Sequence, residues 1–127
     1  MAVKTLLMID DDPFIRRVAQ MSLSKVGGWH VLLADSGKQA MSLLDGQKPD
    51  VILLDVMMPE MDGPTALANI RKIAGAERIP VIFMTAKIQT HEVEHYLKMD
   101  AAGVIAKPFD PLSLSREIEE ILTGKAA

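Results

Sequence analysis

Several short apolar runs in this sequence end in side chains that can bind a metal ion or a phosphate. An acidic run, Asp10–Asp12, follows one of them, and Asp55, Thr85 and Lys107 each follow another. Two carboxylates about 4 Å apart repel each other by ~4 kcal/mol at an effective dielectric constant near 20, so clustered aspartates need a cation or shifted pKa values. If folding gathers these residues, the acidic groups predict a bound divalent cation.

The types of these side chains favour Mg²⁺ and a phosphoryl group. Oxygen ligands with open coordination positions suit Mg²⁺, which is usually held by one or two carboxylates together with waters and phosphate oxygens. Lys107 adds a compact positive charge, and Thr85 adds a hydroxyl donor, for an anion held at the metal. Phosphoryl transfer needs an oxygen nucleophile, a metal ion and donors aimed at the transferred oxygens. Asp55 is the candidate nucleophile.

The apolar runs themselves indicate strands of a parallel sheet. Five runs bounded by polar, Gly or Pro residues are predicted strands: Thr5–Ile9, His30–Ala34, Val51–Leu54, Val81–Met84 and Gly103–Ala106. Most lack strict alternation, as expected for strands covered on both faces. Ligand sites of open α/β sheets lie at the carboxyl ends of the strands, so four of these strands are expected to deliver the polar residues above to one edge.

Apolar residues at helical spacing separate the predicted strands. Four amphipathic helices are indicated by Phe14, Val18 and Met21, by Ala40, Leu43 and Leu44, by Ala66, Ile70 and Ile73, and by Leu114, Ile118, Ile121 and Leu122. A weaker fifth is predicted over His91–Lys98. Asp12 before Pro13, and Asp110 before Pro111, predict helix N-caps. The alternation implies right-handed crossovers with helices on both faces, so the fold class is α/β.

Composition limits the classes of function. The chain has 127 residues, which suits a single domain over residues 1–127. The formal net charge of -3 provides no basic field, so direct nucleic-acid binding is not expected. Zero cysteines exclude thiol catalysis and thiolate metal sites. Neither a signal peptide nor an apolar run of the ~18 to 20 residues needed to span a membrane is recognisable, and the protein is expected in the cytoplasm.

Four motifs, in order along essentially the whole chain, resemble the signatures of receiver domains in the response regulators of bacterial two-component systems. The motifs are Ile9–Asp11, Leu54–Gly63, Met84–Ala86 and Lys107–Phe109. Each fragment is a weak signal alone, but together, on a fivefold β/α alternation, they are specific. The resemblance is to single-domain receivers of the chemotaxis type. It implies a flavodoxin-like, doubly wound sheet of order 2-1-3-4-5 flanked by five helices, and a cis bond before Pro108.

The resemblance also assigns roles at the site. Asp55 is expected to accept the phosphoryl group, with Mg²⁺ held directly by Asp11 and Asp55 and largely through water by Asp10. The backbone carbonyl of Met57 is a further expected metal ligand. Thr85 and Lys107 are expected to contact the phosphoryl oxygens, and Thr85 moves towards them as part of the switch. The chain would therefore catalyse only its own phosphorylation and dephosphorylation and would not be an enzyme in the ordinary sense.

The expected partners follow from the same resemblance. A sensor histidine kinase or a histidine phosphotransfer protein would supply the phosphoryl group. The surface of the fourth helix, fifth strand and fifth helix would then switch and signal to a separate protein, with the chain a monomer or weak dimer. One departure concerns the position three residues before Lys107, which is often aromatic in receivers and is Val104 here. Valine has no ring that could turn at that position, and Tyr96 lies elsewhere in the sequence.

Two enzymatic alternatives use other features of the chain. The segment His91–His95 matches the H-E-x-x-H pattern of zinc proteases, although a solvated helix face explains it more simply and no third ligand is evident at suitable spacing. A phosphatase with an aspartyl nucleophile would share the Mg²⁺ and aspartate chemistry. Such enzymes usually have a second aspartate two positions after the nucleophile, where this chain has Met57. The receiver interpretation accounts for more of the sequence than either.

Overall fold

The computed structural model describes residues 4–58, 61–86 and 90–124, except for the side chains of residues 90–93. Strands and helices alternate along the chain, as the sequence predicted. The strands are β1 (Thr5–Ile9), β2 (His30–Ala34), β3 (Val51–Asp55), β4 (Val81–Thr85) and β5 (Gly103–Ala106). The helices are α1 (Pro13–Gly27), α2 (Gly37–Gly46), α3 (Gly63–Arg71), α4 (Thr90–Lys98) and α5 (Leu114–Thr123). The strands β3 and β4 each extend one residue further than predicted, so Asp55 and Thr85 are the last residues of their strands and do not follow them.

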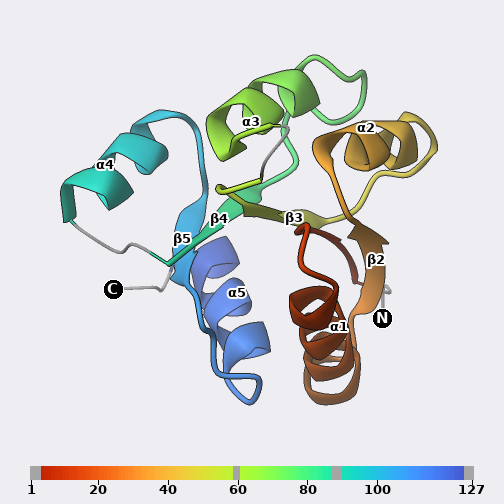
Figure 1. The fold of residues 1–127 in the computed structure, drawn as a ribbon, viewed down its shortest axis with the longest axis vertical. Coiled ribbons are helices and arrows are strands. Elements are labelled where there is room, and N and C mark those ends of the chain that lie inside the picture. Colours follow the sequence, from red (N-terminus) through yellow and green to blue (C-terminus); the bar gives the residue numbers. More distant parts are fainter. Residues whose placement is uncertain (1–3, 59–60, 87–89, 125–127) are drawn as a thin grey trace.

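The five strands form one parallel sheet of order β2-β1-β3-β4-β5. This confirms the α/β class and the doubly wound, flavodoxin-like order 2-1-3-4-5. Figure 1 shows α1 and α5 together on one face of the sheet, with α2, α3 and α4 on the other. The chain order switches direction between β1 and β3, so the carboxyl edge beside these strands is where a ligand site is expected.

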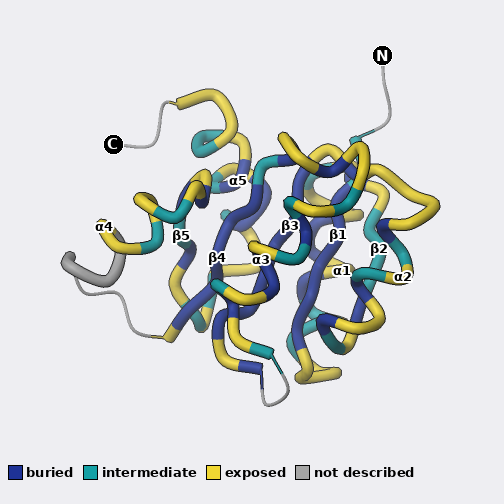
Figure 2. The backbone as a smooth tube through the Cα atoms, turned by 90° about the horizontal axis from the view of Figure 1, so that it is seen from above, coloured by how far each residue is buried: buried dark blue, intermediate teal, exposed yellow. Residues whose placement is uncertain are grey.

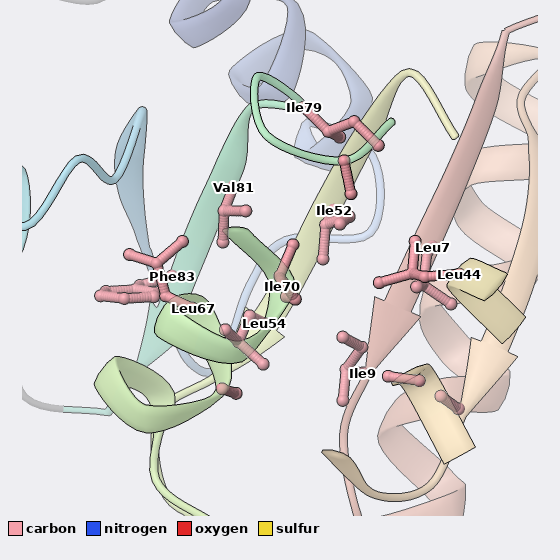
Figure 3. Packing of buried hydrophobic residues seen from close by; sticks show 14 of the residues in the cluster. Leu7, Ile9, Leu44, Ile52, Leu54, Leu67, Ile70, Ile79, Val81 and Phe83 are labelled. Atoms are coloured by element: carbon pink, nitrogen blue, oxygen red, sulfur yellow. The ribbon is translucent and has the colours of Figure 1, made fainter. Parts of the chain in front are cut away.

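The sheet is the centre of the hydrophobic core, and Figure 2 shows its middle strands as the most buried part of the chain. On the face covered by α2, α3 and α4, the core includes Leu54, Ile70 and Phe83 (Figure 3). On the face covered by α1 and α5 it includes Leu23 and Ile118. Burial on both faces explains why the strands lack strict alternation. Each large apolar side chain buried this way contributes roughly 1.5–3 kcal/mol, which makes the sheet a rigid base for the residues at its edge.

One of the two predicted N-caps is confirmed and the other is wrong. The side chain of Asp12 accepts a hydrogen bond from the backbone N–H of Phe14 at 2.9 Å and caps α1. Asp110 does not cap α5, which begins only at Leu114. Its carboxylate accepts a hydrogen bond from the N–H of Leu112 at 2.9 Å, and its carbonyl accepts one from Leu114 at 3.0 Å. The Asp-Pro pair therefore forms a turn that precedes the helix.

The helices are short. The longest, α1, has 15 residues, and the others have 9 or 10. Within the described part of the chain, none combines the length and apolar character required to cross a bilayer.

Candidate functional site at the carboxyl edge of the sheet

Four neighbouring strands place polar residues at the same edge of the sheet. Asp10 directly follows β1, Asp55 ends β3, Thr85 ends β4 and Lys107 directly follows β5. Because these strands are consecutive neighbours in the sheet, their carboxyl ends lie side by side. An open hollow of about 300 Å³ there is lined by Asp10–Asp12, Asp55 and Lys107, together with Met57 and Ala86. The parallel sheet thus brings the predicted acidic residues, Met57 and Lys107 to one hollow, while Thr85 lies at the same edge of the sheet but not in the lining of the hollow.

Three carboxylates form the acidic part of this hollow. One oxygen from each of Asp10, Asp11 and Asp55 lies within 4.8 Å of the others. Asp10 is fully buried and Asp55 nearly so, whereas Asp11 is exposed. The cluster therefore has two carboxylates fixed in the base of the hollow and one at its open side. Such close like charges repel strongly unless a cation offsets them.

Lys107 is the cation that the protein itself supplies. Its Nζ atom lies 2.9 Å from Oδ2 of Asp10 and 3.4 Å from Oδ2 of Asp55. The Lys107–Pro108 peptide bond is cis, as the resemblance implied. The backbone N–H of Lys107 donates to the carbonyl of Thr85 at 2.9 Å, which fixes the ends of β4 and β5 together. Lys107 thus bridges the two buried carboxylates from a position held by the sheet.

Backbone N–H groups orient the same two carboxylates. Oδ1 of Asp55 accepts a hydrogen bond from the N–H of Met57 at 3.0 Å, and Oδ1 of Asp10 accepts one from Asp12 at 2.9 Å. Met57 pairs with Asp62 in an isolated antiparallel bridge, which ties the loop after β3 to the start of α3. The Met57 side chain is 64% exposed and lies at the mouth of the hollow. Each buried carboxylate therefore has one oxygen bound to the backbone and the other close to Lys107.

The environment of the site raises the pKa values of both Asp55 and Lys107. Burial raises the pKa of Asp55, and the nearby charge of Asp10 adds to this, while the Met57 N–H and Lys107 partly oppose it. For Lys107, burial disfavours the ammonium, but hydrogen bonding and attraction to Asp10 and Asp55 outweigh burial, so its pKa is raised. The hollow thus holds Lys107 firmly in its charged form and makes a lone negative charge on Asp55 unfavourable.

The donor set fits a hard divalent cation. The groups concerned are carboxylates, and oxygen-only ligands are the preference of Mg²⁺. Asp10, Asp11 and Asp55 carry three negative charges when ionised against the single positive charge of Lys107, which leaves an excess of two. A dication would balance that excess.

Sequence reasoning missed one contact at the site. Arg16, in the first turns of α1, donates from Nη1 to the backbone carbonyl of Asp10 at 2.7 Å. It thereby fixes the strand end that carries the acidic run. The position of Arg16, six residues after Asp10 and one helical turn after Asp12, was the available signal.

Residues outside the hollow also have defined places. On α4, His95 is exposed, and the side chains of His91 and Glu92 lie outside the described residues. Among the described residues, the acidic triad is the group of side chains placed to hold a metal ion, and it contains no histidine. The structure therefore does not support the zinc-protease alternative within the part of the chain that it describes. Val104 is half-buried beside Phe83, with which it pairs across β4 and β5.

Comparison with known proteins decides the family. Residues 6–119 match the family model described as the response regulator receiver domain. The chain belongs to that family. Receiver domains act in two-component signalling and form a signalling family, not a family of enzymes that turn over substrates. The acidic triad of Asp10, Asp11 and Asp55 is consistent with a metal site of the type typical of receivers.

Related proteins show the extent of the match. An uncharacterised 14.6 kDa protein of Leptolyngbya boryana is 32% identical over 94% of this chain and 91% of its own length. Response regulator Rre1 of a Synechocystis strain is 31% identical over 97% of this chain, but the chain spans only about half, 53%, of that protein. Among solved structures, chemotaxis protein CheY4 of Vibrio cholerae has a TM-score of 0.87 at 26% identity, with 94% of this chain and 99% of that one covered.

Proposed function

We propose that this receiver domain accepts a phosphoryl group on Asp55 from a sensor histidine kinase or a histidine phosphotransfer protein. The observation that carries the proposal is the position of the Asp55 carboxylate, buried at the carboxyl edge beside Asp10, Asp11 and Lys107 in an open hollow. A carboxylate held there has neighbours for a divalent cation on one side and a fixed ammonium on the other. Phosphoryl transfer relies on such positioning and charge balance.

In the proposed reaction, an oxygen of the Asp55 carboxylate attacks the phosphorus of a phosphohistidine. The new O–P bond forms as the N–P bond breaks, and the imidazole nitrogen keeps the electron pair of that bond and takes a proton from solvent. The hydrogen bond from Met57 to Oδ1 of Asp55 holds the carboxylate plane during the approach. Lys107 lies where it can contact the incoming oxygens without leaving the site, and Thr85, at the end of β4, is assigned a hydroxyl contact to them.

We assign the metal site to Asp10, Asp11, Asp55 and the backbone carbonyl of Met57, with Mg²⁺ as the ion. Bound there, Mg²⁺ would supply the positive charge that offsets the carboxylates and the transferred phosphoryl oxygens. The buried Asp10 acts mainly by lowering the local potential, since Lys107 and the Asp12 N–H already occupy its oxygens. The exposed Asp11 and the mouth residue Met57 are better placed for direct ligation.

The phosphoryl donor is proposed to dock across α1 and the turn before α5. Phe14 is 71% exposed and Leu112 is 78% exposed, and Leu112 lines an apolar hollow with Val18 and Met21 of α1. Phe14 lies two residues after Asp12, which lines the acidic hollow. A phosphohistidine must enter the acidic hollow to reach Asp55, so we propose a phosphohistidine-bearing domain as the partner that also covers these apolar side chains.

The output of the proposed switch is the surface of α4, β5 and α5, which would act on a separate protein. We further propose that residues 1–127 form a single receiver domain that acts as a monomer or weak dimer. The domain is proposed to act in the cytoplasm and not to contact nucleic acid directly. The single-domain part of the proposal is supported by the 14.6 kDa relative and the CheY4 chain, each of which is matched over at least 91% of its length.

Intact mass after incubation with acetyl phosphate tests the phosphoacceptor. With Mg²⁺, the protein is expected to gain one phosphoryl group, and EDTA is expected to prevent the gain. Asp55→Asn removes the nucleophile and should abolish it. Asp45→Asn is the matched control, because Asp45 is an exposed aspartate of α2 outside the hollow. Retention of the gain in Asp55→Asn would assign the phosphoryl group to another residue.

A further inference from the structure

Tyr96 of α4 packs its ring against the sheet. The ring stands edge-on to that of Phe83 in β4, with centroids 5.0 Å apart and an interplanar angle of 89°. Phe83 is fully buried, and Tyr96 is half-buried in the same hydrophobic cluster. Edge-to-face pairs of this kind have a preferred geometry, unlike a contact between aliphatic side chains. The contact therefore fixes α4 over β4 in a defined position.

Phe83 also belongs to the strand face that leads to the phosphorylation site. Side chains two residues apart on a strand point to the same face, so Thr85 follows Phe83 on the face covered by α4. Phe83 pairs across the sheet with Val104 of β5, which packs against the same cluster. Because valine has a short side chain, the aromatic group beside Phe83 comes from the helix and not from the neighbouring strand.

The two ends of α4 are attached differently. At its carboxyl end, the Tyr96 carbonyl accepts a hydrogen bond from Met99 at 3.1 Å, and Ala102 then donates to the Val81 carbonyl in β4 at 2.8 Å. At its amino end, the helix follows Thr85 in the chain after residues 86–89. A displacement of Thr85 therefore acts on the amino end of α4 while the carboxyl end stays hydrogen-bonded to the sheet. The Tyr96–Phe83 contact lies in the last turn of the helix, beside this hydrogen-bonded carboxyl end, so a tilt about that end turns the Tyr96 ring against Phe83.

We propose that Tyr96 is a positioning residue that couples occupancy of Asp55 to the placement of α4. This inference rests on the proposed phosphoacceptor function and deepens it by naming the contact that responds. When Thr85 shifts towards a phosphoryl group on Asp55, α4 tilts about its carboxyl end and the ring of Tyr96 changes its position on Phe83. By linkage, any change in the Tyr96–Phe83 contact alters the affinity of the site for the group at Asp55.

Tyr96 is the single tyrosine of the chain and Trp29 the single tryptophan, so both rings can be observed individually. Labelling with 3-fluorotyrosine gives one ring signal in ¹⁹F NMR from Tyr96. Labelling with 5-fluorotryptophan gives a control signal from Trp29, whose indole N–H is bonded to Ser115 at the α1–α5 contact. Beryllofluoride, added with Mg²⁺, serves as a mimic of the phosphoryl group on Asp55. The ¹⁹F signal of bound beryllofluoride reports how much of Asp55 is occupied.

The Tyr96 signal is expected to shift or split on saturation with beryllofluoride, while the Trp29 signal stays in place and Asp55→Asn gives neither change. A bound beryllofluoride signal with an unmoved Tyr96 signal would overturn the coupling and leave the phosphoacceptor proposal intact. The absence of any bound signal would overturn both.

Variants of Tyr96 test the same coupling through affinity. Tyr96→Leu removes the ring and is expected to change the half-saturating beryllofluoride concentration at least threefold, while Tyr96→Phe keeps the ring and stays within twofold of the wild type. A purely structural role of Tyr96 would lower the melting temperature without this change in affinity, and equal half-saturation in all three proteins would contradict the inference.

Discussion

The Nζ atom of Lys107 lies 2.9 Å from Oδ2 of Asp10, a carboxylate with no exposed surface. The same ammonium lies 3.4 Å from Oδ2 of Asp55. The lysine proposed to contact the phosphoryl oxygens is thus already the counter-ion of a buried carboxylate. A phosphoryl group on Asp55 would have to share the Lys107 ammonium with Asp10. The charges of Lys107, the metal ion and the phosphoryl group therefore have to balance those of the carboxylates together.

Replacing Lys107 with methionine keeps the length of the side chain and removes the charge. Because Asp10 then remains buried without its counter-ion, the free energy of unfolding in EDTA is expected to fall by about 3 kcal/mol. Mg²⁺ should recover part of this loss by neutralising the same carboxylates. Urea unfolding with EDTA and with Mg²⁺ measures both values, and Lys38→Met, at an exposed position of α2, is the control. An equal loss with and without Mg²⁺ would contradict a metal site beside Lys107.

Asp55→Asn is expected to stabilise the metal-free protein near neutral pH. A raised pKa means that the ionised Asp55 carboxylate is less favourable in the folded than in the unfolded chain. The neutral amide removes this cost, which we place on the order of 1 kcal/mol, as is usual when a functional site is neutralised. As the pH falls through the raised pKa, wild-type Asp55 also becomes neutral and the advantage of the variant should shrink. Melting temperatures in EDTA across this range test the prediction; a lower melting temperature for Asp55→Asn at neutral pH would refute it.

The loop after Asp55 depends on the absence of a side chain at Gly63. A Cβ atom added there would lie 2.8 Å from Cγ1 of Val56 and 3.0 Å from its backbone Cα. Since Val56 directly follows Asp55, Gly63→Ala should displace the loop and cost about 1–3 kcal/mol of stability, and should weaken Mg²⁺ binding. Gly46→Ala is the matched control, because a Cβ at that helical position meets nothing within 4 Å. Calorimetric titration with Mg²⁺ and urea unfolding would show whether the two variants differ as expected.

Much of the fold could be predicted from the sequence because each strand is a short apolar run bounded by polar residues. The strand bounds differ from the prediction only at Asp55 and Thr85, where a polar residue still forms the last pair of its strand. The sheet order was implied by the resemblance and not by the runs themselves. The failure at Asp110 arose because an Asp-Pro pair initiates a turn as readily as a helix, and the hydrogen bonds alone distinguish them.

The sequence predicted which residues form the site, but not the contacts between them. Strand ends place Asp10, Asp55 and Lys107 at one edge, yet their distances depend on rotamers and on the loops that follow the strands. Sequence gave no sign that Lys107 pairs more closely with Asp10 than with Asp55. The contact of Tyr96 with Phe83 was also missed, because it depends on where α4 lies over the sheet and not on a motif.

The N-cap of α3 provides a pH-dependent test of the scaffold below the site. Oδ1 of Asp62 accepts a hydrogen bond from the backbone N–H of Thr65 at 2.8 Å, and this bond lowers the pKa of Asp62 below its usual value of 3.8. Because the pKa of Asp62 is lowered by folding, the cap stabilises the fold fully at pH values above the pKa of this aspartate in the unfolded chain. The stabilisation is lost as the pH falls through the lower pKa of Asp62 in the folded protein.

Asp62→Ala is therefore expected to lower the free energy of unfolding by about 1 kcal/mol near neutral pH and by less in acid, where the wild-type side chain is also protonated. Asp62→Asn retains an uncharged acceptor and should stay close to the wild type near neutral pH. Urea unfolding of the three proteins at neutral pH and below the pKa of Asp62 measures these differences. The backbone bridge between Met57 and Asp62 is retained in all three proteins, so a loss that is constant across pH would contradict a charged cap as its cause.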